Sequence, residues 1–328
     1  MTQHAGESLP IRFRPAEPGA VAATERLIFG VGVRATTVEE AIRLLDGIDP
    51  GPCQVAFLNA NNANEAWQDP EVADAFRSGI VFNDGIGLEL ASRLLYGQGF
   101  PEDLNGTDFV PRFLADSART MTIYILGGAR GVAERATAAL SALAPRHRFV
   151  GAQHGYFEPA LSQALVADIR ASGADILILA LGTPKQELWM RDNLAATGVR
   201  LGFCVGGLLD FAAGTKPRAP ALVRRLRCEW IFRLLLEPRR LTKRYVLGNL
   251  LFLARLAIEK RRLAARRMAR RSGPAAQRRA GLPLAGKRVV RRRLVELAMA
   301  AAILADIYLL TSDGKVWSLL GRLTSAHC

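Results

Sequence analysis

Short apolar runs alternate with amphipathic stretches of helical length between Ala35 and Gly207. Most runs are continuously apolar, as expected of parallel strands that helices cover on both faces. The predicted strands are Cys53–Leu58, Ile80–Phe82, Thr122–Leu126, Arg148–Val150, Asp175–Leu181 and Leu201–Val205. The predicted helices are Val38–Leu45, Asn62–Arg77, Leu88–Leu95, Asp108–Ala118, Val132–Leu143, Pro159–Ser172 and Pro184–Ala196. This alternation predicts a doubly wound α/β sheet.

Changes in composition and in the hydrophobic pattern divide the chain into five segments. The α/β pattern predicts a Rossmann-like, doubly wound, mostly parallel sheet over residues 25–217, after a tail of residues 1–24. Residues 218–271 are rich in Arg and Leu at helical spacing and predict a basic amphipathic helical appendage. Gly, Pro, Ala and Arg then predict a linker over residues 272–287. A basic and apolar extension, residues 288–328, completes the chain.

The charge of the chain is concentrated toward its C-terminus. Half of the 328 residues are hydrophobic and 23% are charged, which is ordinary globular composition. Residues 1–200 hold 17 basic and 23 acidic residues, whereas residues 201–328 hold 27 basic and 7 acidic residues. The basic part predicts an anionic partner. Because its arginines alternate with Leu, Ile and Val rather than with stacking aromatics, an anionic membrane surface is favoured and no nucleic acid is expected.

Cysteine spacing and apolar runs indicate the compartment. Cys53, Cys204, Cys228 and Cys328 show no CxxC spacing and no histidines at metal-ligand intervals, which favours a reduced, cytoplasmic chain. The first residues lack the apolar run of a signal peptide. Leu294–Thr311 is strongly apolar but contains Glu296 and Asp306, so we expect it to lie at an interface rather than span a membrane. The prediction is a cytoplasmic protein attached peripherally to the inner face of the cell membrane.

Polar residues follow the first two predicted strands, at the sheet edge where α/β proteins bind ligands. Asn59 begins a cluster of four asparagines, which suits a helix cap or a ligand-facing role. Asn83, Asp84 and Gly85 follow the second strand. Asp84 either caps the next helix or accepts a proton from a substrate hydroxyl, since a carboxylate desolvated in a cleft has a raised pKa.

Glycine-rich turns follow the later strands. Gly127 and Gly128 precede a helix and suit a phosphate cradle, although the spacing matches neither GxGxxG nor a Walker motif. Gly182, Lys185, Gln186 and Glu187 begin the next helix, either as an ordinary helix start or as ligands to phosphate, base and hydroxyl groups. Gly207, Asp210, Lys216 and Arg218 follow the last strand and bring cations to the same edge. His147 and His154 have no partner in view and are expected to be structural.

Nine motifs in register carry a resemblance to a known family. They are Asn83–Gly87, Asn105–Asp108, Leu126–Gly128, His154–Phe157, Gly182–Glu187, Gly206–Gly214, Arg218–Pro220, Glu229–Leu234 and Glu237–Arg240. Over about residues 25–250 the chain resembles the WecG/TagA/CpsF family of bacterial glycosyltransferases, glycosyltransferase family 26. The resemblance implies inverting, metal-independent transfer from a UDP-sugar to a polyprenyl-diphosphate-linked saccharide in cell-surface or exopolysaccharide assembly, with Asp84 as general base.

An inverting transfer needs one base and positive charge near the departing diphosphate. We assign catalysis to Asp84, Asn83 and Asn59. The expected substrate-binding residues are Gly85, Gly127, Gly128, Gly182, Lys185, Gln186, Glu187, Gly207, Asp210, Lys216, Arg218, Arg224 and Arg233. The sequence has no Asp-x-Asp motif, so no metal or cofactor is expected. The sequence is compatible with a homo-oligomer. The alternative function is a non-catalytic membrane-surface scaffold of a polysaccharide-assembly complex.

Two positions depart from the family pattern. Many relatives have Pro-x-Arg-Val where this chain has Pro101–Leu104, so that Asp103 stands in place of an arginine. Phe57 stands where relatives often have a threonine two residues before Asn59. Both positions are expected near the sugar site, so the identity of the donor sugar stays open.

Overall fold

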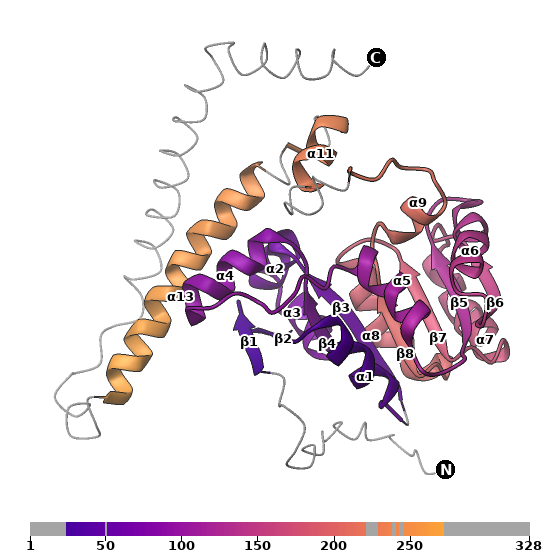
Figure 1. The fold of residues 1–328 in the computed structure, drawn as a ribbon, viewed down its shortest axis with the longest axis horizontal. Coiled ribbons are helices and arrows are strands. Elements are labelled where there is room, and N and C mark those ends of the chain that lie inside the picture. Colours follow the sequence, from indigo (N-terminus) through magenta and orange to yellow (C-terminus); the bar gives the residue numbers. More distant parts are fainter. Residues whose placement is uncertain (1–23, 50, 221–228, 238–240, 243–245, 272–328) are drawn as a thin grey trace.

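The computed structural model describes residues 24–49, 51–220, 229–237, 241–242 and 246–271. These residues form an eight-stranded sheet with the order β1-β2-β4-β3-β8-β7-β5-β6 (Figure 1). The strands are β1 (Thr24–Ile28), β2 (Val31–Ala35), β3 (Cys53–Leu58), β4 (Ile80–Asn83), β5 (Thr122–Gly127), β6 (Arg148–Gln153), β7 (Ile176–Ala180) and β8 (Leu201–Cys204). β1 pairs with β2 antiparallel and every other pairing is parallel. The predicted Rossmann-like class is confirmed.

Helices cover both faces of this sheet. On one face lie α2 (Ala60–Gln68), α3 (Pro70–Arg77), α4 (Ile86–Tyr96), α7 (Ser162–Ala171) and α8 (Lys185–Thr197). On the other lie α1 (Val38–Asp46), α5 (Gly106–Asp116), α6 (Val132–Leu143) and α9 (Leu208–Ala212). A single 3-10 turn, η1 (Pro159–Leu161), leads into α7. Among the described residues, α11 (Glu229–Leu236) and α13 (Gly248–Arg271) follow the sheet domain.

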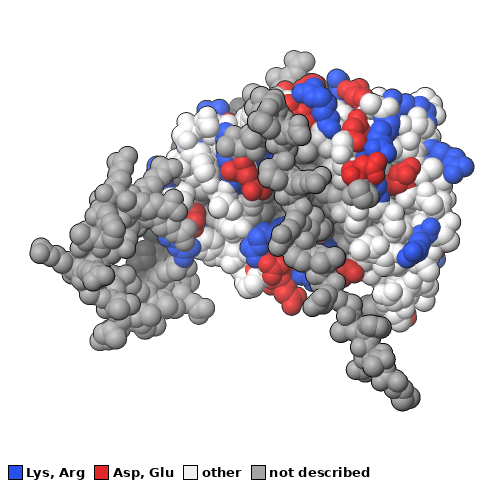
Figure 2. Space-filling model, turned by 90° about the horizontal axis from the view of Figure 1, so that it is seen from below, with Lys and Arg blue, Asp and Glu red and all other residues white. Residues whose placement is uncertain are grey.

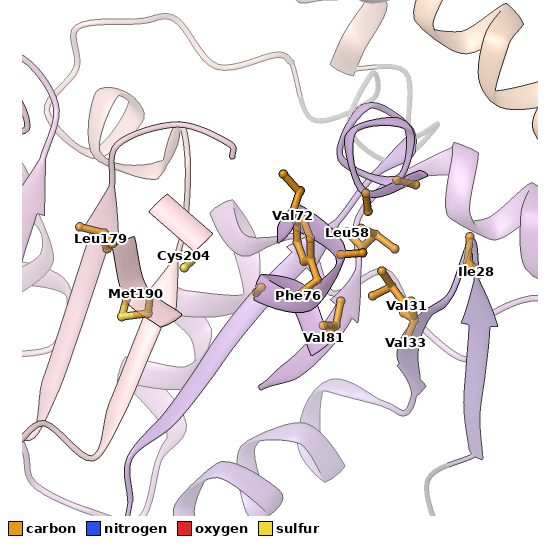
Figure 3. Packing of buried hydrophobic residues seen from close by; sticks show 14 of the residues in the cluster. Ile28, Val31, Val33, Leu58, Val72, Phe76, Val81, Leu179, Met190 and Cys204 are labelled. Atoms are coloured by element: carbon orange, nitrogen blue, oxygen red, sulfur yellow. The ribbon is translucent and has the colours of Figure 1, made fainter. Parts of the chain in front are cut away.

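Each strand divides its apolar residues between two cores, because successive side chains point to opposite faces. In β3, Val55 and Phe57 join the core under α1, α5 and α6, whereas Leu58 joins the core under α2 to α4. Figure 3 shows the second core, where Val72 and Phe76 of α3 lie in the same cluster as Leu58. Burial on both faces explains why the strand sequences are continuously apolar.

The hairpin of β1 and β2 was missed by the sequence analysis. The two strands are joined by Phe29 and Gly30, which have φ angles of 52° and 84°. The hairpin adds an antiparallel edge to a parallel sheet, and its short second strand carries an alternating burial pattern. That alternation was the available signal, but it is only five residues long.

The single helix predicted over residues 62–77 is two helices, α2 and α3. Pro70 lies in the first turn of α3, where its missing N–H costs little, and it cannot continue α2 because its ring would clash with the preceding turn. The Asp69 side chain accepts a hydrogen bond from the Glu71 N–H at 2.9 Å. A proline inside a long apolar period therefore marks a helix boundary here.

The basic segment is partly built into the core. In residues 218–271, the first described helix is α11, and residues 218–220 are not helical. α13 packs against α2 and α4, and Phe252 and Leu256 are buried in the core on that face. Arg255 donates to the Asn64 carbonyl at 3.0 Å and to its side-chain oxygen at 2.9 Å.

Several predictions lie outside the described residues. These are the tail of residues 1–23, Arg224, the linker of residues 272–287 and the extension of residues 288–328.

On the face drawn in Figure 2, acidic and basic side chains of the described residues are interspersed rather than gathered. No helix among the described residues is both long enough and apolar enough to cross a bilayer.

Candidate active site

A cleft of about 1680 Å³ lies at the carboxyl edge of the sheet. Its walls come from the segments after β3, β4, β5, β7 and β8, together with residues of α11 and α13. In the sheet, β4 lies on one side of β3, whereas β8 and then β7 lie on its other side. Ligands of open α/β sheets bind at such a switch point, because the loops there diverge and leave a crevice.

Asp84 lies in this cleft, directly after β4. Its Oδ2 accepts a hydrogen bond from Asn59 Nδ2 at 3.1 Å, and its main-chain N–H donates to the Leu58 carbonyl at 2.9 Å. Burial raises the pKa of Asp84 to about 6, and the negative charge of Asp103 adds to the rise. The Asn59 hydrogen bond and the Arg233 charge oppose it. Such a carboxylate is ionised near neutral pH yet basic enough to take a proton.

Asn59 caps a helix, one of the two roles that the sequence left open, and it also lies in the cleft beside Asp84. Its Oδ1 accepts a hydrogen bond from the Asn62 N–H at 3.0 Å and caps α2, while its Nδ2 faces Asp84. The cap fixes the side-chain rotamer, so the donor toward Asp84 is held in place by the helix end. Asn61 and Asn62 also line the cleft, whereas Asn64 bonds to α13.

Asp103 is the site residue to which the sequence analysis gave no role. It lines the cleft, and its Oδ1 accepts a hydrogen bond from the Gly85 N–H at 2.8 Å. Gly85 has a φ of 82°, a conformation that a side chain would strain. The like charge of Asp103 raises the pKa of Asp84. The departure from the family motif had marked this position without showing what the new carboxylate would contact.

Asn83 is fully buried and does not line the cleft. Its Nδ2 donates to the Glu102 carbonyl at 2.9 Å, and Glu102 Oε2 accepts from the Val38 N–H at 2.7 Å. These bonds connect the end of β4 to the segment that carries Asp103. The placement suits a residue that positions the two carboxylates, rather than one that meets a substrate.

The glycine turn after β5 is shaped mainly by close packing. Gly127 does not line the cleft, and a Cβ there would lie 2.4 Å from the Ala180 carbonyl oxygen. Gly128 does line the cleft, but its N–H already donates to that oxygen at 3.1 Å. The close approach of β5 and β7 therefore explains Gly127, whereas a Cβ on Gly128, which has a φ of 70°, would lie 2.6 Å from Val132 Cγ1. A phosphate cradle at this turn would have to use amides after Gly128.

Gln186 connects two loops of the cleft floor. Its Oε1 accepts hydrogen bonds from the Gly182 N–H and the Gly206 N–H, each at 3.2 Å. Its Nε2 donates to Glu187 Oε1 at 2.8 Å, which fixes the direction of the amide. Gly182, Lys185 and Gln186 line the cleft, whereas Glu187 lies beneath it, fully buried.

The buried carboxyl group of Glu187 has a raised pKa. Burial raises its pKa to about 7, against the hydrogen bonds from Gln186 and Thr183 that favour the ionised form. Within the described residues, Oε2 has no hydrogen-bond partner. A folded-state pKa above the unfolded value stabilises the protein at low pH, and this contribution is lost as the pH rises through about 7.

Replacing Glu187 by Gln is therefore expected to raise the free energy of unfolding at about pH 8 by up to about 3 kcal/mol, with little change at about pH 4. Denaturant melts at the two pH values measure this difference. Glu134→Gln, on the exposed surface of α6, is the control and should change neither value. An equal effect of Glu187→Gln at both pH values would contradict the assignment.

Two of the predicted cations, Lys216 and Arg233, line the cleft and form ion pairs with acidic side chains. Lys216 Nζ lies 3.2 Å from Asp210 Oδ2, and Arg233 Nη2 lies 2.7 Å from Glu229 Oε1. These four side chains and Gly207 line the cleft. Within the described part of the chain, no three His, Cys, Asp or Glu side chains gather where they could hold a metal ion.

Arg218 does not line the cleft, and it pairs with Asp108. Its guanidinium and that of Arg233 lie 6.0 and 4.8 Å from the centre of the Phe211 ring. Both arginines therefore lie near the Phe211 ring, and the one that lines the cleft is Arg233.

A family model described as the glycosyl transferase WecG/TagA/CpsF family matches residues 26–266. The chain belongs to this family. The resemblance carried by the sequence motifs is thereby confirmed, and the protein is a glycosyltransferase with a sugar donor and an acceptor, in cell-surface polysaccharide synthesis. The matched range includes α11 and most of α13, so both helices are part of the family domain.

Proposed function

We propose that this glycosyltransferase moves a hexosyl group from a UDP-sugar to a polyprenyl-diphosphate-linked saccharide, with inversion at the anomeric carbon and without a metal ion. The observation that carries the proposal is the carboxylate of Asp84, raised in pKa and held by Asn59 inside the large cleft. The product would be a lipid-linked intermediate of an exopolysaccharide or another cell-surface polymer.

In this mechanism Asp84 takes the proton of the acceptor hydroxyl. The hydroxyl oxygen then forms a bond to the anomeric carbon, and the bond from that carbon to the diphosphate oxygen breaks on the opposite face. The bonding electrons leave with UDP, so a single in-line displacement inverts the configuration. Asn59 keeps the carboxylate oriented, and the Asn83 contacts hold the neighbouring segment in place.

The diphosphate gains negative charge as it departs, so cations near it stabilise the transition state. Lys185 lines the cleft, is exposed and forms no ion pair with the described residues. Lys216 and Arg233 also line the cleft, and a diphosphate would compete with Asp210 and Glu229 for them. These three side chains are the proposed diphosphate-binding cations, and Arg218, which pairs with Asp108 outside the cleft lining, is not among them.

The basic C-terminal part supports peripheral attachment to an anionic membrane on the cytoplasmic face. Residues 201–328 carry 27 basic and 7 acidic residues, and each basic residue near an anionic surface contributes about 1 kcal/mol. Attachment there would bring the cleft to an acceptor that is itself anchored in the membrane.

The test is release of UDP from a panel of UDP-sugars, measured with and without a polyprenyl-diphosphate-linked saccharide. Release with one donor, dependent on the lipid-linked acceptor and unaffected by a chelator, is the expected result. Loss of activity with chelator and its recovery with magnesium would contradict the metal-independent mechanism. No release with any donor would favour the scaffold function instead.

The pKa of Asp84 predicts a pH dependence. Because the base must be ionised, kcat/KM should fall as the pH drops below about 6. Removing the neighbouring charge with Asp103→Asn should lower the pKa of Asp84 and shift this acid limb to lower pH. A pH–rate profile of both proteins measures the shift. An acid limb that stays in place in the variant would show that Asp103 does not act on the titrating group.

A further inference from the structure

Helix α4 exposes three large apolar side chains to solvent. Ile86, Leu90 and Leu94 are 46%, 39% and 40% exposed. Their spacing of four residues places them along one side of the helix, so they form a continuous line. The opposite side of α4, with Leu88, Ala91 and Leu95, is buried in the core. The exposed line therefore lies outside the buried core.

This line begins inside the cleft. Ile86 and Leu90 line the cleft wall two and six residues after Asp84, and Leu94 follows one turn farther along α4. Leu253 of α13 also lines the cleft and is 43% exposed. α4 and α13 lie side by side (Figure 1). We name Ile86, Leu90, Leu94 and Leu253 the α4–α13 strip.

Other exposed leucines lie at the end of α11 and around the start of α13. Leu236, Leu247 and Leu251 join the four residues of the strip, and together they make seven of the eleven exposed large apolar residues of the described chain. Scattered apolar residues on a surface need no explanation, but a concentration beside a cleft indicates a binding surface. Lys260 and Arg261, exposed farther along α13, add positive charge to the same helix.

We infer that the α4–α13 strip binds the hydrocarbon chain of the lipid-linked acceptor, next to the acceptor's own diphosphate, which enters the cleft. This inference rests on the proposed function, because it assumes an acceptor that carries a long chain. The polar reacting groups of such a molecule enter at Asp84, and its apolar part has to leave the cleft. The strip is the apolar path that begins at the cleft wall and runs outward along α4.

The test compares the binding of two diphosphates, a long polyprenyl diphosphate and dimethylallyl diphosphate, both presented in the same mild detergent. The wild-type chain is expected to bind the long-chain compound more tightly. Leu94→Ser should weaken that binding about fivefold and leave the short-chain affinity unchanged, because Leu94 lies outside the cleft lining. Leu94→Met keeps an apolar side chain and should retain the long-chain affinity. Leu143→Ser, at an exposed leucine of α6, is the matched control.

Equal affinity of the wild-type chain for both compounds would overturn the inference, as would an equal loss of both in Leu94→Ser. A wild-type dimer that Leu94→Ser converts to a monomer would assign the strip to self-association instead. The binding measurement does not depend on turnover. A failure of the proposed function would therefore appear separately, as a preserved chain-length preference without UDP release.

Discussion

Asp84→Asn is expected to lower turnover by about two to four orders of magnitude, the usual loss when a general base is removed. The substitution keeps the shape of the side chain, and the amide oxygen can still accept the hydrogen bond from Asn59. What it removes is the basic carboxylate, because an amide does not take up a proton near neutral pH. Single-turnover measurements with donor and acceptor in excess of their binding constants isolate this chemical step.

The comparison variant is Asp103→Asn, which changes the neighbouring carboxylate in the same cleft. Its turnover at about pH 8 should stay within about tenfold of the wild-type value, because Asp84 is ionised there in both proteins. Folding of both variants is checked by their thermal melts. If Asp84→Asn turned over like the wild type, or if Asp103→Asn lost as much, the base would have to be sought elsewhere in the cleft.

The position of the cleft could be predicted from the sequence because the strands of a parallel sheet end at one edge. Asn59, Asp84, Gly182 and Gly207 follow four different strands and line one cavity. Their convergence needed only the strand assignment and the rule that ligands bind at the carboxyl ends. The same rule could not tell which polar groups meet the cavity and which support it. Asn83 is adjacent to Asp84 in sequence, yet it is fully buried beneath the site.

The contacts of Asp103 and Gln186 depend on tertiary packing. Asp103 meets the Gly85 N–H across 18 residues, and Gln186 receives the Gly206 N–H across 20 residues. No local pattern encodes either distance, because each depends on how a loop folds back over the strand ends. The pairing of Arg233 with Glu229 is different, because the two residues are four apart on α11 and the sequence alone could have indicated it.

The packing of α13 against the sheet domain could not be predicted from the sequence. Its arginines gave it the appearance of a surface helix, while its apolar residues could have faced lipid or protein equally well. The structure buries Phe252 and Leu256 against the domain and pairs Arg255 with Asn64. One face of this basic helix is thus committed to the core, and only the remaining faces can meet a membrane.

Phe252→Ala is expected to lower the free energy of unfolding of the whole domain by about 3–5 kcal/mol, because it removes a ring from a closed core. Phe252 is 2% exposed, and its ring centre lies 5.3 Å from that of Phe29 in the β1–β2 turn. The loss would act on two elements that are distant in sequence. Denaturant unfolding followed by tryptophan fluorescence measures it, because Trp67 lies 5.0 Å from Phe29 in the same cluster.

Two variants separate packing from general damage to α13. Phe252→Leu keeps most of the apolar volume and should cost clearly less than the alanine variant. Leu251→Ala, at an exposed neighbour on the same helix, should change stability by less than about 0.5 kcal/mol. If Phe252→Ala were as mild as Leu251→Ala, α13 would be an independent appendage. The expected loss would instead show that the core holds α13 in place beside the cleft, which Asn249, Phe252 and Leu253 line.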